Sequence, residues 1–193
     1  IKGNSLISDQ PLLPHEEFMA LAPMYGNRSH WDAIYSSAQQ YQEYLKANNL
    51  VDDMDVARML LGKEDSLPKW DFLLVDETQD YTLVQLRLMA SLCKDITGLV
   101  FAGDEPQIVY PSDFSWTRAK EAVHKAWGVT PPEIFILDFN YRNPQPVTEL
   151  GLTVMSLRSK QLALPSCPKV RSNQSLTPRP LRIVLSKSEL MDV

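Results

Sequence analysis

Cysteine is scarce in this chain of 193 residues, and long apolar runs are absent. The two cysteines, Cys93 and Cys167, lie far apart and match no metal or redox spacing. We therefore expect a reduced intracellular setting, cytoplasmic or nuclear, rather than a disulfide scaffold. No apolar run approaches the roughly 18–20 residues of a membrane span, and no signal peptide begins the chain. Because the first residue is Ile1 and not Met, we expect a section of a longer protein.

An excess of basic charge is also lacking, because the formal net charge is −5. This excludes a general basic surface for nucleic acid, although a local groove can still be basic. Hydrophobic residues make up 44% of the chain, which is enough for a packed core. The length fits one generous domain, or one domain and a fraction of another.

Helical periodicity dominates the first third of the chain. A short helix is predicted at His15–Leu21, and a longer one at about 30–47, where Ser29 and Asp32 form a capping-box pattern. A third helix is predicted at about 53–61. We interpret residues 1–67 as a small helical subdomain.

Strand-length apolar runs alternate with helical patterns from residue 68 onward. The predicted strands are Phe72–Val75, Gly98–Ala102 and Ile134–Leu137, and the predicted helices cover about 82–93, 115–127 and 145–158. Thr82 and Gln85 form a capping-box pattern at the start of the first of these helices. Continuous apolar runs are typical of strands covered on both faces, and hence of a parallel sheet. The fold class is therefore α/β, with a parallel sheet flanked by helices.

Polar groups follow each predicted strand directly. Asp76 and Glu77 follow the first, Gly103 and Asp104 with Gln107 follow the second, and "DFNYRNPQP" follows the third. Ligands of open parallel sheets bind beyond the carboxyl ends of the strands. Acidic residues after a single strand are common in ordinary loops, but three such strand ends in succession indicate a site.

These motifs resemble a known family. The segments "VDETQD", "GDEPQIVY" and "NYRNPQP" are similar, in order and spacing, to the Walker B, sensor and arginine motifs of the UvrD/Rep family of superfamily 1 helicases. The resemblance is strongest over about residues 50–158. It implies a RecA-like P-loop NTPase sheet, whose C-terminal half would occupy residues 68–160. Residues 161–180 would be a linker, and 181–193 would begin a second RecA-like domain.

The resemblance also implies ATP and Mg²⁺ as cofactors, and roles for individual residues. Asp76 would organise the magnesium ion, and Glu77 would be the base that positions the attacking water. The other nucleotide-site residues would be Gln79 in a network between nucleotide and nucleic acid, Asp104 beside it, Gln107 as γ-phosphate sensor, Arg142 as arginine finger and Tyr141 stacked on adenine. Tyr141 could instead be a core residue, and Arg142 could pair with Asp138 or Glu149.

Single-stranded nucleic acid is the partner that the resemblance implies, with DNA favoured over RNA. Tyr110 matches an aromatic residue that stacks on bases in the family. The segment after it, "PSDFSWTRA", departs from the family pattern in length and lacks its glycine. Trp116 and Arg118 could supply the same stacking and phosphate contacts, or could pack the start of the next helix.

A phosphate-binding loop is missing from the sequence. None of the seven glycines belongs to a Gly-rich loop that ends in Gly-Lys-Ser/Thr. We therefore expect this polypeptide alone to be inactive and the missing helicase regions to flank it. Two interpretations stay open: the central part of an ATP-driven helicase, or a non-catalytic helicase-like module that binds nucleic acid or protein.

Overall fold

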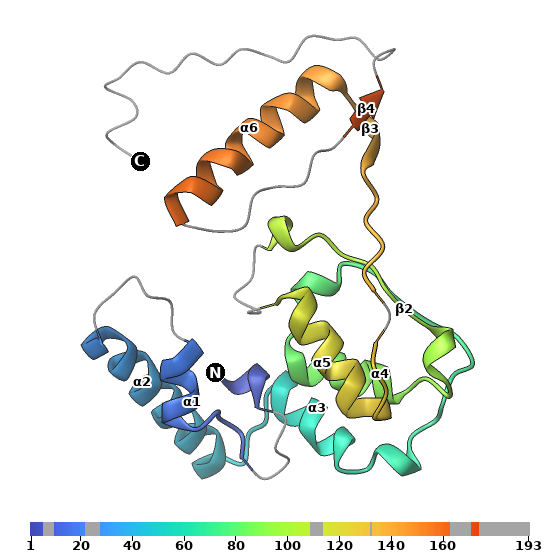
Figure 1. The fold of residues 1–193 in the computed structure, drawn as a ribbon. Helices are drawn as coiled ribbons and strands as arrows, with labels where there is room; N and C mark the ends of the chain where they lie inside the picture. The colour runs from blue at the N-terminus through green and yellow to red at the C-terminus, as the bar shows by residue number, and fades with distance from the viewer. Residues whose placement is uncertain (6–9, 22–27, 109–113, 132, 163–170, 174–193) are drawn as a thin grey trace. The chain divides into compact units, whose positions relative to one another are not determined.

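The computed structural model describes residues 1–5, 10–21, 28–108, 114–131, 133–162 and 171–173. It divides into two compact units, residues 1–133 and 134–193, which are described separately below (Figure 1). Among the described residues, five short 3-10 turns lie before or between the larger elements: η1 (Lys2–Asn4), η2 (Glu64–Ser66), η3 (Thr78–Asp80), η4 (Ile96–Gly98) and η5 (Glu105–Gln107). Within the described residues, no helix is both long and apolar enough to cross a membrane.

Three helices lead the first unit: α1 (His15–Leu21), α2 (Arg28–Ala47) and α3 (Asp53–Leu61), as predicted. Aromatic packing joins α1 to α2, because the Phe18 ring packs against Trp31 and Tyr35, with ring centroids 6.3 and 5.6 Å away. The predicted Ser29–Asp32 capping box is wrong. Helix α2 already begins at Arg28, and the Asp32 carboxylate is 2.9 Å from His15 of α1 instead.

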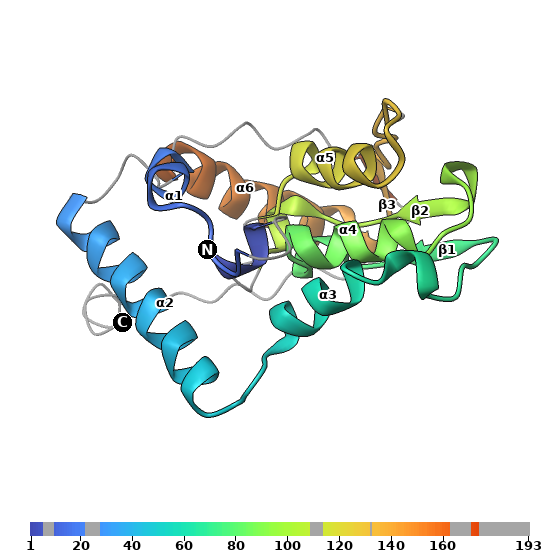
Figure 2. The same ribbon diagram turned by 90° about the horizontal axis from the view of Figure 1, so that it is seen from below.

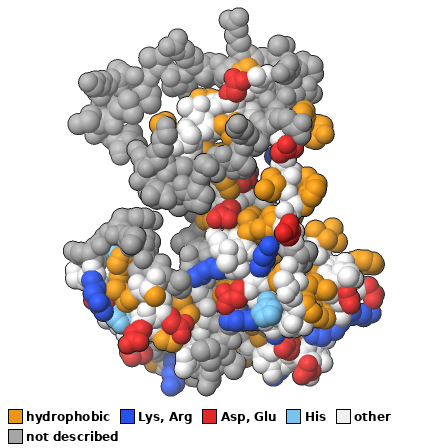
Figure 3. Space-filling view, in the orientation of Figure 1, with side chains coloured by type: hydrophobic (Ala, Val, Ile, Leu, Met, Phe, Trp, Pro, Cys, Tyr) orange, Lys and Arg blue, Asp and Glu red, His pale blue; other side chains and the backbone are white. Residues whose placement is uncertain are grey.

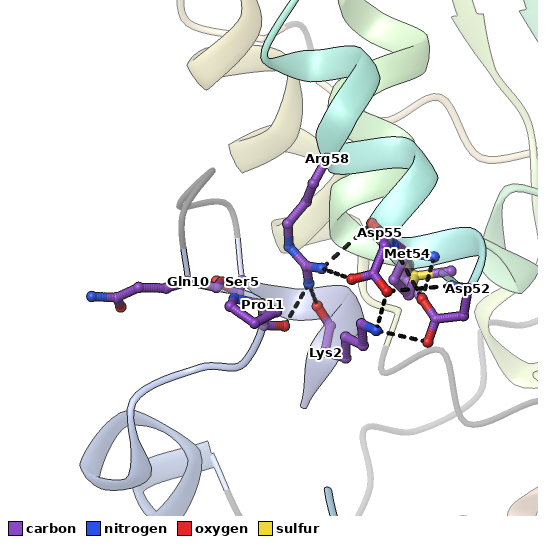
Figure 4. Close-up of polar contacts among 9 residues, drawn as sticks. Lys2, Ser5, Gln10, Pro11, Asp52, Met54, Asp55 and Arg58 are labelled. Carbon is purple, nitrogen blue, oxygen red and sulfur yellow. Dashed lines mark hydrogen bonds and ion pairs between the residues drawn. The ribbon is translucent and has the colours of Figure 1, made fainter. Parts of the chain in front are cut away.

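A true capping box begins α3. The Asp52 carboxylate accepts from the N–H groups of Met54 and Asp55, and the Asp55 carboxylate accepts from the N–H of Asp52. Both carboxylates also bind the Lys2 ammonium, at 2.9 and 2.6 Å (Figure 4). These contacts fix η1 against the start of α3.

Arg58 of α3 also binds the N-terminal segment. Its buried guanidinium pairs with Asp55 and donates to the backbone carbonyls of Lys2 and Pro11 (Figure 4). One side chain therefore holds together two points of the N-terminal segment that are nine residues apart in sequence. Desolvation lowers the pKa of the Arg58 guanidinium from its ordinary value, but the neighbouring carboxylates oppose this shift.

The sheet of the first unit consists of β1 (Leu73–Val75) and β2 (Leu99–Phe101), which pair in parallel as predicted. Side chains alternate across a strand, so register partners share a face. Val75 is buried and its partner Phe101 packs against the core, whereas Leu74 and its partner Val100 are exposed. The expectation that both faces are covered is therefore wrong for the described residues.

Helices α4 (Leu83–Ser91) and α5 (Trp116–Trp127) form the core with this sheet. Figure 2 shows α4 beside the two strands, with α3 and α5 to either side of it. The predicted Thr82–Gln85 cap is present, because Gln85 Oε1 accepts from the Thr82 N–H at 2.9 Å. The buried core cluster comprises Leu83, Leu86, Phe114, Ala119 and Ala122.

The second unit contains β3 (Phe139–Pro144), α6 (Gln145–Leu162) and β4 (Arg171–Asn173). Strand β3 pairs in parallel with β4, which lies within the predicted linker 161–180. The predicted strand Ile134–Leu137 is wrong, because these residues have no regular structure and their side chains are exposed. An apolar run forms a strand only when a neighbour supplies backbone hydrogen bonds, and β4 supplies them to residues 139–144 instead.

The predicted helix at 145–158 is confirmed by α6. The predicted strand after residue 180 lies outside the described residues. The mixture of helices with a small parallel sheet agrees with the α/β prediction, whereas the RecA-like strand arrangement and the domain boundaries stay predictions. On the face drawn in Figure 3, acidic and basic side chains are interspersed rather than gathered by sign.

Candidate active site

Strand β1 ends in two exposed carboxylates, Asp76 and Glu77. The backbone of Glu77 is left-handed, with φ 50° and ψ 42°, a conformation that non-glycine residues adopt rarely. Asp76 Oδ1 accepts the Glu77 N–H at 2.9 Å, which supports the turn. The chain therefore bends sharply where β1 ends, and both acids come to its carboxyl end.

Thr78 attaches this bend to the neighbouring strand. Its side chain is fully buried, and its N–H and Oγ1 both lie within hydrogen-bond distance of the Ala102 carbonyl oxygen, at 2.9 and 2.7 Å. The Ala102 N–H in turn donates to the carbonyl of Val75 at 2.9 Å. The end of β1 and the end of β2 are thus joined on both sides of the acid pair.

Gln79 crosses from one strand end to the other. Its side-chain Nε2 donates to Glu77 Oε2 at 2.7 Å, and its Oε1 accepts from the Asp104 N–H at 2.9 Å. The residue is only 2% exposed. Gly103 leaves room for it, because a Cβ there would come 2.6 Å from Gln79 Oε1.

The second strand end continues the same series of hydrogen bonds. Asp104 and Gln107 are exposed, and Gln107 Nε2 donates to Asp104 Oδ2 at 2.6 Å. The side chains and backbone of Glu77, Gln79, Asp104 and Gln107 therefore form one hydrogen-bonded row across the ends of β1 and β2. The structure brings together four of the residues that the sequence predicts, with Asp76 directly beside them.

The donor set suits a magnesium ion that arrives with phosphates. No group of three or more His, Cys, Asp or Glu residues converges as a metal cage in the parts of the chain that the structure describes. Mg²⁺ in nucleotide sites is commonly held by one or two carboxylates together with water and phosphate oxygens. A single exposed carboxylate at Asp76 fits that pattern, and an exposed carboxylate at Glu77 fits a base that faces water.

The predicted residues Tyr141 and Arg142 belong to β3 of the second unit. Tyr141 is 78% exposed, with its ring centroid 4.4 Å from that of Phe139, so it is not a core residue within the described chain. Asn140 Oδ1 accepts from the N–H groups of Arg142 and Asn143, both at 3.0 Å. Among the described residues the Arg142 guanidinium has no ion-pair partner, and Glu149 accepts instead from Gln145.

Two of the predicted nucleic-acid residues, Trp116 and Arg118, lie in the first turn of α5. Trp116 is the first residue of α5; its ring makes an edge contact with Phe114 and packs against the core cluster. Arg118 is half-buried, and its N–H donates to the capping Ser115 Oγ at 3.3 Å. Tyr110 lies outside the described residues.

The sequence does not reveal that Thr78 is part of the site. It also does not reveal the contacts by which Lys2, Asp52, Asp55 and Arg58 hold the N-terminal segment against α3. Thr78 carries no sequence signal of its own, because its role depends on the carbonyl of Ala102 in another strand. The Asp52–Asp55 spacing before an apolar stretch was a signal for a cap, since an acid at the N-cap and another three residues later is a helix start pattern.

Two comparisons with known proteins show which family the chain belongs to. The chain is 29% identical over 120 residues to the ATP-dependent DNA helicase srs2 of Schizosaccharomyces pombe. The match covers 60% of this chain but 13% of that relative, so the chain spans a small part of the relative's length. Residues 5–121, more than half of the chain, match the family model of the UvrD/REP helicase N-terminal domain. The acid pair and strand β2 lie within those residues, and the chain belongs to the UvrD/REP helicase N-terminal domain family.

Proposed function

We propose that this chain is part of an ATP-dependent DNA helicase that couples ATP hydrolysis to movement on single-stranded DNA. The observation that carries the proposal is the hydrogen-bonded row of Glu77, Gln79, Asp104 and Gln107 across the ends of two parallel strands. Such strand ends are where open parallel sheets bind ligands. Membership of a helicase family supports the proposal, as does the similarity to a DNA helicase.

Two carboxylates would have different tasks in this site. Asp76 would hold Mg²⁺, which when bound neutralises negative charge on the phosphates of ATP. Glu77 would accept a proton from the attacking water and orient it, because its carboxylate is exposed and held in place by Gln79. Gln107 would donate an amide hydrogen to the γ-phosphate, and Asp104 would orient that amide through the 2.6 Å bond between them.

Arg142 and Tyr141 would each contact the nucleotide. The planar guanidinium of Arg142 would donate two parallel hydrogen bonds to a phosphate, and its lack of an ion-pair partner among the described residues suits this role. The exposed ring of Tyr141 would stack on adenine. The phosphate-binding loop, which is absent from this sequence, would come from another part of the longer protein.

Single-stranded DNA would bind near the start of α5. Tyr110 would stack on bases, and Arg118 would contact a phosphate. Trp116, which is only partly buried against the core cluster, would add to the stacking through the part of its ring that stays exposed. DNA is favoured over RNA because the similar protein is named a DNA helicase. We also propose a cytoplasmic or nuclear location for this protein, because DNA is found there.

A second candidate function is a non-catalytic module that binds nucleic acid or protein within a larger assembly. The observation that favours it is the missing Gly-Lys-Ser/Thr loop. The two candidates differ in whether the longer protein turns over ATP, so one assay distinguishes them.

The deciding experiment compares the longer protein that carries this chain with its Glu77→Gln variant. ATP turnover is measured without nucleic acid, with single-stranded DNA and with single-stranded RNA. We expect single-stranded DNA to stimulate ATP turnover by the longer protein. The Glu77→Gln substitution should reduce this turnover on the order of 10²–10⁴-fold, which is the contribution of general acid–base catalysis. Glu121→Gln, at an exposed ion pair on α5, is the matched control. If the unmodified longer protein does not turn over ATP, the helicase proposal is wrong and the non-catalytic binding module is the remaining candidate.

A further inference from the structure

The two residues that follow Glu77 are polar, yet both are buried. Thr78 is 0% and Gln79 is 2% exposed, whereas Glu77 itself is exposed. Burying a hydroxyl or an amide is unfavourable unless its hydrogen bonds are made inside the protein. The partners that these two side chains have are therefore informative about why polar residues occupy these positions.

Both residues bind the end of β2. Thr78 Oγ1 lies 2.7 Å from the Ala102 carbonyl oxygen, and Gln79 Oε1 accepts from the Asp104 N–H at 2.9 Å. The amide orientation of Gln79 follows from its partners. An N–H can only donate, so Oε1 must face Asp104, and a carboxylate can only accept, so Nε2 must face Glu77.

Glu77 needs such support, because its left-handed backbone is unfavourable for a residue with a side chain. A residue in this conformation persists where the surrounding structure fixes it, and such residues are found at functional sites. A base must also be held within a fraction of an ångström of its working position, since small misplacements slow reactions strongly.

We propose that Thr78 and Gln79 are positioning residues that fix the Glu77 carboxylate to the end of β2, so that Glu77 and the Asp104–Gln107 segment move as one body. This inference rests on the proposed function for its effect on turnover, although its structural part does not. Thr78 fixes the backbone of the bend, and Gln79 fixes the carboxylate. A ligand that displaces Gln107 would therefore displace Glu77 through Asp104 and Gln79.

The structural part is tested on the 193-residue chain without nucleotide, by hydrogen exchange at the Asp104 amide. Gln79→Met keeps the side chain's length and removes its hydrogen bonds to Glu77 and Asp104, so the Asp104 amide is expected to exchange about 2- to 10-fold faster, the equivalent of one net hydrogen bond. Gln79→Glu keeps an acceptor for Asp104 and is expected to retain protection. Gln40→Glu, on the exposed face of α2, is the matched control.

The functional part is tested by steady-state turnover of the longer protein. Gln79→Glu loses the donor to Glu77 and places a second carboxylate beside it, so kcat is expected to fall on the order of 10²-fold with KM for ATP unchanged. Thr78→Val removes only the hydroxyl and is expected to lower kcat, whereas Thr78→Ser restores it. Thr153→Val, whose hydroxyl binds only its own helix α6, is the control.

The positioning role of Gln79 and the ATPase function can fail independently of each other. Unchanged Asp104 exchange in Gln79→Met overturns the positioning role, whether or not the longer protein hydrolyses ATP. Faster exchange together with unchanged kcat in Gln79→Glu and Thr78→Val also overturns it, because Glu77 would then not depend on these residues. Faster exchange in the 193-residue chain, together with no turnover at all by the longer protein, supports the structural coupling and contradicts the proposed function alone.

Discussion

Gly103 lies so close to the Gln79 side chain that a residue with a Cβ would not fit at position 103 without a shift of its neighbours. A Cβ on Gly103 would come 2.6 Å from Gln79 Oε1 and 3.1 Å from the backbone nitrogen of Thr78. The reason for glycine here is therefore the approach of the Gln79 amide, and one of the two contacts is with backbone, which cannot move aside. The end of β2 therefore has the shape that the Gln79 side chain requires.

Gly103→Ala is accordingly expected to lower the free energy of unfolding by about 1–3 kcal/mol, the usual cost of forcing atoms into a packed site. Urea unfolding of the 193-residue chain measures it. Gly151→Ala is the control, because Gly151 lies in α6 with nothing within 4 Å of a Cβ, and alanine there should stabilise the helix by up to about 1 kcal/mol. Equal effects of the two substitutions would contradict the close contact.

Arg58 should be the most costly single charge to remove from the first unit. Arg58→Met keeps much of the side chain's bulk but leaves the carbonyls of Lys2 and Pro11 without their donor. We expect a loss of about 1.5–3 kcal/mol, the range for hydrogen bonds to charged groups, because Asp55 keeps Lys2 as a partner. Lys94→Met at an exposed ion pair should change stability by less than about 1 kcal/mol. Thermal unfolding measures both variants, and a similar shift for each would contradict the prediction.

Asp52 should make the stability of the chain depend on acid pH. Partial burial raises the pKa of Asp52, but the Lys2 ammonium and the Asp55 N–H together lower it below its ordinary value of 3.8. Because the folded pKa is the lower one, the stabilisation is present above pH 3.8 and is lost as the pH falls through the folded value.

Asp52→Asn isolates this effect, since asparagine is also a good N-cap. The difference in unfolding free energy between the natural chain and the variant should be largest near neutral pH and shrink as the pH falls below 3.8. Urea titrations at a series of pH values measure it. A difference that does not vary with pH would show that the charge of Asp52 is not involved.

The two faces of the sheet should respond differently to truncation. Leu86→Ala removes a fully buried side chain of α4 and should cost about 2–5 kcal/mol. Leu74→Ala removes a side chain that is 74% exposed and should cost less than about 1 kcal/mol in the 193-residue chain. Chemical denaturation of both variants provides the test, and a large loss for Leu74→Ala would mean that this face is covered.

Arg142 should need its planar shape as well as its charge. If it contacts the γ-phosphate, Arg142→Ala is expected to lower turnover of the longer protein on the order of 10³-fold. Arg142→Lys should recover only part of this, because an ammonium cannot make the paired hydrogen bonds of a guanidinium. Arg28→Ala, exposed at the start of α2, serves as the comparison. Full recovery by lysine would argue against a phosphate contact by the fork.

Local sequence signals predicted most of the helices and both strands of the first unit. Apolar spacing placed α1, α3 and α5 within about one residue of their observed bounds, and the Thr82–Gln85 pattern correctly marked the start of α4. The acid pair, Asp104 and Gln107 were predicted to share one edge of a sheet, and their strands do pair in parallel. These features depend on periodicity or on neighbours a few residues away, which a sequence displays directly.

Features that depend on distant neighbours were not predictable in the same way. Residues Ile134–Leu137 have the composition of a strand but no partner among the described residues, and the strand forms at Phe139–Pro144 against β4. Asp32 satisfies the spacing of a cap yet pairs with His15, because α1 lies alongside α2. Lys2 and Thr78 make their contacts over 50 and 24 residues of sequence, so no local pattern reveals them.

The left-handed backbone of Glu77 has a consequence for how this chain can evolve. Glycine at that position would relieve about 1–2 kcal/mol of backbone strain, and asparagine would relieve part of it. Laboratory selection for heat resistance alone would therefore be expected to discard the glutamate, while selection for activity would restore it. If Glu77 is the base, the residue that gives the highest activity at this position is not the residue that gives the highest stability.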